Sequence, residues 1–138
     1  MKVNKTALYV HWPFCKSRCT YCDFRAFPYQ EKRIAGYADA LMREIALWGE
    51  RLNHPEITTM YFGGGTPSYI PLPVLGQTVE QIHKAFRVPE GIEFTMEANP
   101  EEAIKKAVSE IEKVAAQVKT NRIMLYPYAH LSSDLSSP

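Results

Sequence analysis

The chain has 138 residues, of which 46% are hydrophobic, 22% charged and 12% aromatic, and these proportions fit one globular domain and exclude a disordered chain. The 16 basic and 15 acidic side chains leave a net charge of +1, so no strong field attracts nucleic acid or an anionic membrane, and we expect neither as a partner. No apolar run approaches the roughly 18 to 20 residues that span a bilayer and no export signal precedes the first apolar segment, so we expect a cytoplasmic protein.

Segments typical of strands and helices alternate along the chain. Short apolar or alternating runs predict strands at 7–11, 57–62, 92–97 and 122–126. Apolar residues spaced three and four apart predict amphipathic helices at 30–52, 71–86 and 101–119, with Trp48 and Phe86 in the core. The predicted fold class is therefore α/β, in the order β-α-β-α-β-α-β with right-handed crossovers and a parallel sheet. Because a closed barrel needs eight strands, we expect a half barrel or an open sheet.

Cysteines cluster in the loop after the first predicted strand. Cys15, Cys19 and Cys22 have the spacing C-x3-C-x2-C, and such an odd, clustered set is not a disulfide framework. Three thiolates on one loop can each bind one iron of a [4Fe–4S] cluster and leave the fourth iron open to another ligand. The spacing leaves two alternatives, a structural zinc site that recruits His11 or His54, and unligated thiols.

A glycine-rich turn follows the second predicted strand. Gly63, Gly64, Gly65 and Thr66 lie at the carboxyl end of that strand, where α/β sheets bind ligands. Glycines let the backbone adopt positive φ and approach a ligand closely, although a purely structural turn has the same composition. The turn lacks the lysine and the spacing of a phosphate-binding loop. Glu97 ends the third predicted strand, where it either faces a pocket or lies in solvent.

The first part of the chain resembles a known family. Residues 8–24, LYVHWPFC through YCDF, resemble the start of radical S-adenosylmethionine enzymes, and more narrowly the oxygen-independent coproporphyrinogen oxidase-like family, which includes haem chaperones. The runs YFGGGTPS and TMEANP are further hallmarks of that family, and the resemblance covers about residues 7–100.

This resemblance implies a cofactor set. The three cysteines would bind a [4Fe–4S] cluster, whose electron cleaves S-adenosylmethionine to a 5′-deoxyadenosyl radical, and the family's substrates and ligands include tetrapyrroles. The glycine turn would hold the methionine amino group, and Tyr21 would lie near the adenine. The residues implied to contact the cofactor are Tyr9, Tyr21, Phe24, Gly63, Gly64, Gly65, Thr66 and Glu97.

The end of the chain resembles a different family. The run YPYAHLSS and the predicted helix before it are similar to a piece of the editing domain of archaeal threonyl-tRNA synthetases. The resemblance implies that Pro127, Ala129 and His130 are remnants of a seryl-adenosine pocket. Much of both families is missing, so we expect a chimera of segments 1–99 and 100–138 that form one folded unit.

Three functional hypotheses follow. The first is binding of the cluster and S-adenosylmethionine without full turnover, because the regions that bind a tetrapyrrole substrate are absent; no catalytic residue is assigned. The second is a non-catalytic hybrid whose cysteines are empty or hold zinc, and the third is a partial editing pocket. If residues 101–138 keep their own structural preferences, exposed sheet edges can also drive dimerisation.

Overall fold

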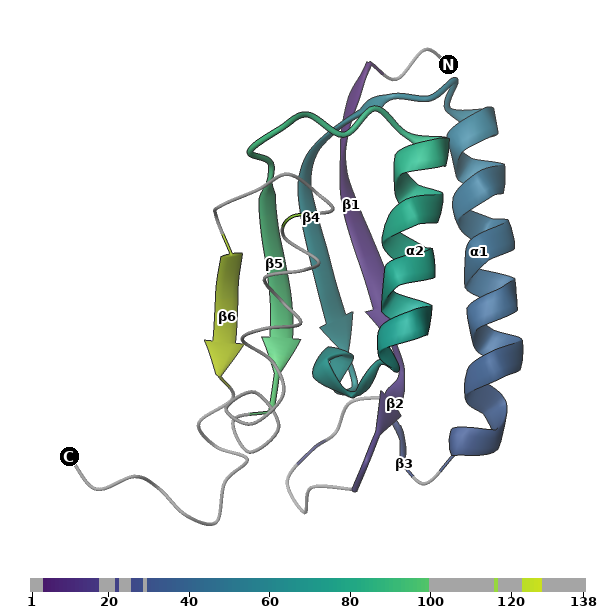
Figure 1. Ribbon diagram of the computed structural model, residues 1–138, viewed down its shortest axis with the longest axis vertical. Coiled ribbons are helices and arrows are strands. Elements are labelled where there is room, and N and C mark those ends of the chain that lie inside the picture. The colour runs from purple at the N-terminus through teal and green to yellow at the C-terminus, as the bar shows by residue number, and fades with distance from the viewer. Residues whose placement is uncertain are drawn as a thin grey trace, which may run out of the picture.

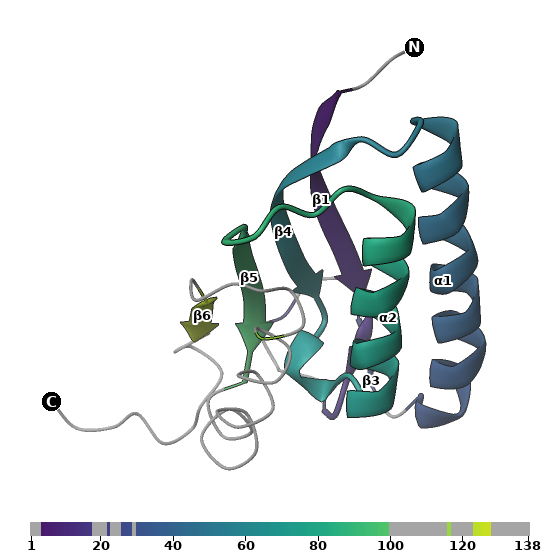
Figure 2. The same ribbon diagram turned by 45° about the horizontal axis from the view of Figure 1, so that its top comes forward.

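A parallel sheet with two helices on one face forms the centre of the computed structural model (Figures 1 and 2). The structure describes residues 4–17, 22, 26–28, 30–99 and 116, together with the backbone of 123–127. The sheet has four strands in the order β1-β4-β5-β6, and all neighbours are parallel. Its strands are β1 (Lys5–Trp12), β4 (Glu56–Gly64), β5 (Glu93–Ala98) and β6 (Ile123–Pro127).

The connections between strands carry the remaining elements. A short two-stranded sheet pairs β2 (Phe14–Cys15) with β3 (Phe27–Pro28). The helices are α1 (Ile34–Arg51) and α2 (Leu72–Ala85), each preceded by a 3₁₀ turn, η1 (Glu31–Arg33) or η2 (Pro67–Tyr69). The predicted α/β class and the parallel sheet are confirmed, and the described strands form an open sheet. The predicted helix at 101–119 lies outside the described residues except for Ala116, which is helical.

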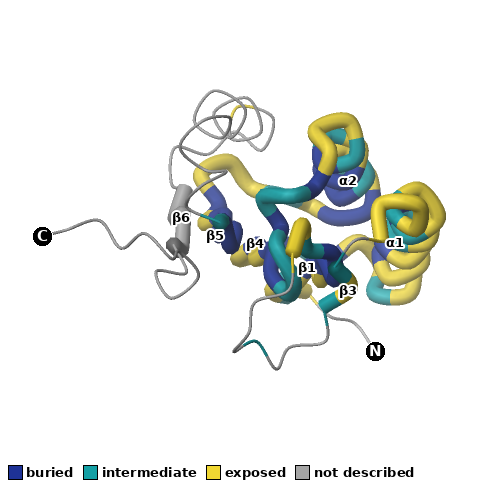
Figure 3. Tube along the Cα trace, turned by 90° about the horizontal axis from the view of Figure 1, so that it is seen from below, coloured by how far each residue is buried: buried dark blue, intermediate teal, exposed yellow. Residues whose placement is uncertain are grey.

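Buried apolar side chains of β1, β4 and β5 give the sheet one apolar face. In β4, Met60 and Phe62 are 1% and 0% exposed, and Phe94 of β5 packs edge-on to Phe62 with ring centroids 5.3 Å apart. Helices α1 and α2 cover this face, as the view from the end of the sheet shows (Figure 3). The other face carries the intervening residues of the same strands and is free of helices within the described ranges. The core therefore lies between one face of the sheet and the two helices.

Trp48 is a correction to the predicted core. Its side chain is 45% exposed, and it contacts Arg51, whose guanidinium carbon lies 5.8 Å from the ring centroid. The buried stripe of α1 consists of Ala38, Ile45 and Gly49, and Trp48 lies to one side of it. An amphipathic pattern includes residues at the border of the apolar face, and the width of the contact with α2 decides which of them are buried. The expected burial of Phe86 is confirmed, at 6% exposed.

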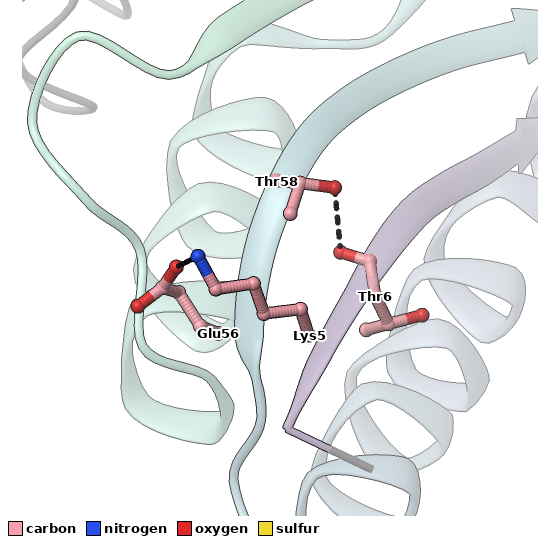
Figure 4. Close-up of polar contacts among 4 residues, drawn as sticks. All are labelled: Lys5, Thr6, Glu56 and Thr58. Carbon is pink, nitrogen blue, oxygen red and sulfur yellow. Dashed lines mark hydrogen bonds and ion pairs between the residues drawn. The ribbon is translucent and has the colours of Figure 1, made fainter.

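Polar contacts join the amino-terminal ends of β1 and β4 (Figure 4). Lys5 Nζ lies 3.0 Å from Glu56 Oε1, and the Thr58 hydroxyl donates to the carbonyl of Thr6 at 3.3 Å. The register shifts between Thr6 and Leu8, after which the pairing runs without interruption from Leu8 with Met60 to Trp12 with Gly64. The carboxyl ends of β1 and β4 are therefore aligned, and both lead into the loops that the sequence singles out.

Candidate functional site

The cysteine loop and the glycine turn are joined by their backbones. The amide of Gly65 donates to the carbonyl of Trp12 at 2.6 Å, and the amide of Thr66 donates to that of Phe14 at 3.0 Å. A Cβ atom on Gly65 would lie 2.9 Å from Cys15 Sγ. The first cysteine therefore packs directly on the glycine turn.

The base of the cysteine loop is closed by the small sheet. Phe14 and Cys15 pair with Phe27 and Pro28, and the amide of Phe27 donates to the carbonyl of Pro13 at 2.6 Å. The side chains of Cys15 and Cys22 are both half-buried. Cys19, Tyr21 and Phe24 lie outside the described residues, and within the described ranges no three potential metal ligands lie together.

The two histidines considered as zinc ligands lie at opposite ends of the sheet. His11 is in β1 near its carboxyl end, and its Nδ1 lies 3.0 Å from the Tyr9 hydroxyl. His54 lies between α1 and the start of β4, with Nδ1 2.8 Å from the carbonyl oxygen of Ala85. Because the nine residues of β4 span roughly 25 to 30 Å, His54 is too far from Cys15 to share a metal with it.

Gly64 adopts a conformation that favours glycine. Its φ is +118°, and a Cβ atom would lie 2.7 Å from His11 Cε1. Its amide donates to Glu97 Oε2 at 3.0 Å. The turn is thus held by a side chain of β5 as well as by the main chain of the cysteine loop.

Glu97 is buried and hydrogen-bonded through both carboxylate oxygens. It is 7% exposed, and while Oε2 accepts from Gly64, Oε1 accepts from the Tyr61 hydroxyl at 2.6 Å. Donors to a carboxylate form stronger hydrogen bonds than neutral pairs do. Of the two alternatives for Glu97, exposure to solvent is wrong, because the carboxylate is engaged beside the glycine turn.

Two tyrosine rings fill the space beside Gly63. A Cβ atom at Gly63 would lie 2.6 Å from Tyr61 Cε1 and 3.1 Å from Tyr9 Cε2, and the ring centroids of the tyrosines are 5.8 Å apart. Burial and then the negative charge of Glu97 raise the pKa of the Tyr9 phenol above its ordinary value. Aromatic rings, a carboxylate and glycine backbone thus lie together on the face of the sheet that the helices leave open.

Tyr61 is the residue of this site that sequence reasoning missed. It opens the run YFGGGTPS but was assigned no role there, although a usable signal exists, because alternation in β4 places it on the same face as Gly63 and the strand register pairs it with Tyr9. Ser68 was also missed; its hydroxyl oxygen accepts from the amide of Asn99 at 3.1 Å and so ties η2 to the end of β5.

The predicted editing remnant is described only in part. Pro127 ends β6 opposite Ala98 of β5, at the carboxyl edge of the sheet where Glu97 also lies. Ala129 and His130 lie outside the described residues. Among the described residues no helix combines the length and apolar character that a bilayer crossing needs.

Comparisons with known proteins find two groups of relatives for this chain. The first part is similar to the mitochondrial radical S-adenosyl methionine domain-containing protein 1 of Bos taurus, with 33% identity over 72% of this chain and 23% of the relative. It is also similar to the heme chaperone HemW of Bacillus subtilis, with 28% identity over 83% of the chain and 30% of the relative. The solved structure of coproporphyrinogen III oxidase (HemN) from Escherichia coli, a radical SAM enzyme, matches with a TM-score of 0.72 and 21% identity over 90% of this chain and 28% of that chain.

The second part matches a different group. The model of the archaea-specific editing domain of threonyl-tRNA synthetase matches residues 77–138, and the threonine–tRNA ligase of Methanosarcina mazei is 77% identical over 46% of this chain. The chain spans only 11% of that ligase and 23% of the Bos taurus protein. It thus combines sequence similar to radical S-adenosyl methionine proteins of the coproporphyrinogen oxidase type with sequence similar to archaeal editing domains, which is consistent with a chimera.

Proposed function

We propose that the chain binds a [4Fe–4S] cluster and S-adenosylmethionine at the carboxyl edge of its sheet. The observation that carries this proposal is the direct packing of Cys15 on the glycine turn, with Gly65 and Thr66 hydrogen-bonded to the carbonyls just before that cysteine. A cluster on the cysteine loop would therefore lie beside the backbone that is proposed to hold the cofactor. The three thiols need a reducing compartment, which the cytoplasm provides.

The chemistry of the available side chains fits both cofactors. Cys15, Cys19 and Cys22 supply three thiolates, so a cubic cluster would keep one iron open. When bound, the cluster would supply that open iron for the methionine group of the cofactor and an electron for cleavage of its sulfonium.

The glycine turn and its neighbours would hold the cofactor's organic part. The proposed contacts of the glycine turn are Gly63, Gly64, Gly65 and Thr66, with Glu97 nearby. Tyr9, Tyr21 and Phe24 would supply apolar surface for the adenosyl group. The chain covers less than a third of the heme chaperone and of the oxidase that it resembles, and the proposal is confined to binding of the two cofactors.

The test is anaerobic reconstitution of the whole chain with iron and sulfide, followed by iron analysis and by EPR of the reduced protein with and without S-adenosylmethionine. We expect about four irons per chain and an EPR signal that shifts when the cofactor is added. Cys19→Ser should lose the cluster, and Ser17→Ala in the same loop is the matched control that should keep it. Unchanged iron content in Cys19→Ser, or a folded wild-type chain that takes up zinc but no cluster, would contradict the proposal.

The match of residues 77–138 to the editing-domain model favours a second candidate, a partial seryl-adenosine pocket. Pro127, Ala129 and His130 would contribute to it, with Pro127 at the same sheet edge as Glu97. Calorimetric binding of a non-hydrolysable seryl-adenosine analogue, lost in His130→Ala, is the expected result. Absence of binding to the wild-type chain would dispose of this candidate and leave the C-terminal segment a structural part of a hybrid.

A further inference from the structure

Three successive amides of the glycine turn are held in two different ways. Those of Gly65 and Thr66 donate to main-chain carbonyls, of Trp12 and Phe14. The amide of Gly64 instead donates to a side chain, the Glu97 carboxylate. The conformation of the turn at Gly64, where φ is +118°, therefore depends on how Glu97 is oriented.

The orientation of Glu97 depends in turn on Tyr61. The carboxylate is 7% exposed, and its other oxygen accepts the Tyr61 hydroxyl at 2.6 Å. Tyr61 lies in β4 and Glu97 in β5, so this hydrogen bond bridges two strands on the open face of the sheet. A carboxylate that accepts a donor at each oxygen is held more firmly against rotation than one that has lost the donor at one oxygen.

We propose that Tyr61 is a positioning residue for the glycine turn, acting through Glu97. Its phenol holds the carboxylate so that Oε2 captures the Gly64 amide, and this sets the backbone conformation next to the cysteine loop. The importance of that conformation for S-adenosylmethionine rests on the function proposed above, but the coupling itself is a property of the chain without any cofactor. Tyr61 is assigned no contact with the cofactor and no catalytic role.

Removal of the Tyr61 hydroxyl alone distinguishes positioning of Glu97 from packing by the tyrosine ring. Tyr61→Phe keeps the ring that fills the space beside Gly63 and removes the hydroxyl that donates to Glu97. Tyr69→Phe is the matched control, since it removes a hydroxyl that donates to Glu31 Oε1 at 3.0 Å, from a residue close to the same turn.

The decisive measurement is amide hydrogen exchange by NMR on the whole chain without cluster or cofactor. In Tyr61→Phe we expect the Gly64 amide to exchange about tenfold faster, because it loses a fixed charged acceptor, while Gly65 and Thr66 keep their wild-type rates. Tyr69→Phe should change none of the three. Unchanged exchange at Gly64, or equal acceleration at all three amides, would overturn the proposal, because the second result reports only a general loss of stability.

A double-mutant cycle tests whether Tyr61 acts through Glu97. Glu97→Ala should release the Gly64 amide by itself, and Tyr61→Phe in that background should add nothing further. Additive effects would mean that Tyr61 holds the turn by another route and would also overturn the proposal.

A ligand titration extends the test to the cofactor. In reconstituted protein, Tyr61→Phe should weaken the binding of S-adenosylmethionine about tenfold, as followed by the EPR shift. Tyr69→Phe should leave this binding unchanged. If no cluster forms in the wild-type chain, the proposed function fails while the exchange experiment still decides the role of Tyr61.

Discussion

The space around Gly65 is filled from two sides. A Cβ atom there would lie 2.8 Å from the carbonyl oxygen of Phe14 and 2.9 Å from Cys15 Sγ, contacts too close to tolerate without movement. The backbone beside it is fixed by the hydrogen bond from Gly65 to Trp12, so the cysteine is the part that can shift.

Gly65→Ala should therefore lower both stability and iron binding. We expect a loss of about 1 to 3 kcal/mol in the free energy of unfolding, the usual cost of inserting a methyl group into a filled site. Iron uptake on reconstitution should fall, since Cys15 must move. Gly76→Ala in α2 is the control, because a Cβ there meets no atom within 4 Å and alanine is the better helix former. Normal iron content in Gly65→Ala would show that the packing of Cys15 on the turn does not matter for cluster binding.

At the scale of elements, α1 and α2 approach each other closely at one end. A Cβ at Gly49 of α1 would lie 2.6 Å from the carbonyl oxygen of Ala85, the last residue of α2. His54 bonds to that same carbonyl, so the end of α2 is held by both the helix α1 and the loop that follows it.

Gly49→Ala and Gly36→Ala form a matched pair on one helix. Gly36 has no atom within 4 Å of an added Cβ, so alanine there should raise the free energy of unfolding by roughly 0.5 to 1 kcal/mol through helix propensity. Gly49→Ala should lower it by about 1 to 3 kcal/mol, because the helices must separate. Urea unfolding followed by circular dichroism measures both. Equal effects of the two substitutions would rule out close helix packing at Gly49.

At the scale of the whole molecule, the question is whether the two segments that resemble different families fold as one cooperative unit. Strand β6, from the segment similar to editing domains, pairs with β5 along its full length, from Phe94 with Ile123 to Ala98 with Pro127. The family-model match begins at residue 77, within α2, so it also includes β5. A shared strand–helix–strand pattern explains how the two segments can join in one sheet, because parallel pairing depends on main-chain geometry more than on side chains.

Proline substitutions in β6 test this unit. Successive amides of a strand point to opposite sides, so one of Met124→Pro and Leu125→Pro removes a donor to β5 and the other serves as its control. We expect one of the two to lower the free energy of unfolding by about 1 to 3 kcal/mol and the other by less. Tryptophan fluorescence, which reports on Trp12 and Trp48, should follow the same transition as circular dichroism. If neither proline alters this transition, β6 is not coupled to the rest of the sheet.

The sequence by itself determined the alternation of strands and helices, the parallel sheet and the meeting of the cysteine and glycine motifs at one edge. These follow from local patterns, since hydrophobic period and turn residues act over a few positions. It left open whether Glu97 is solvated and whether His54 can join a metal site, and its prediction that Trp48 lies in the core was wrong. Only the tertiary structure decided these three points, because each depends on residues distant in the chain. Tyr61 and Gly64 enclose Glu97, and the length of β4 separates His54 from Cys15. The width of the helix contact leaves Trp48 exposed.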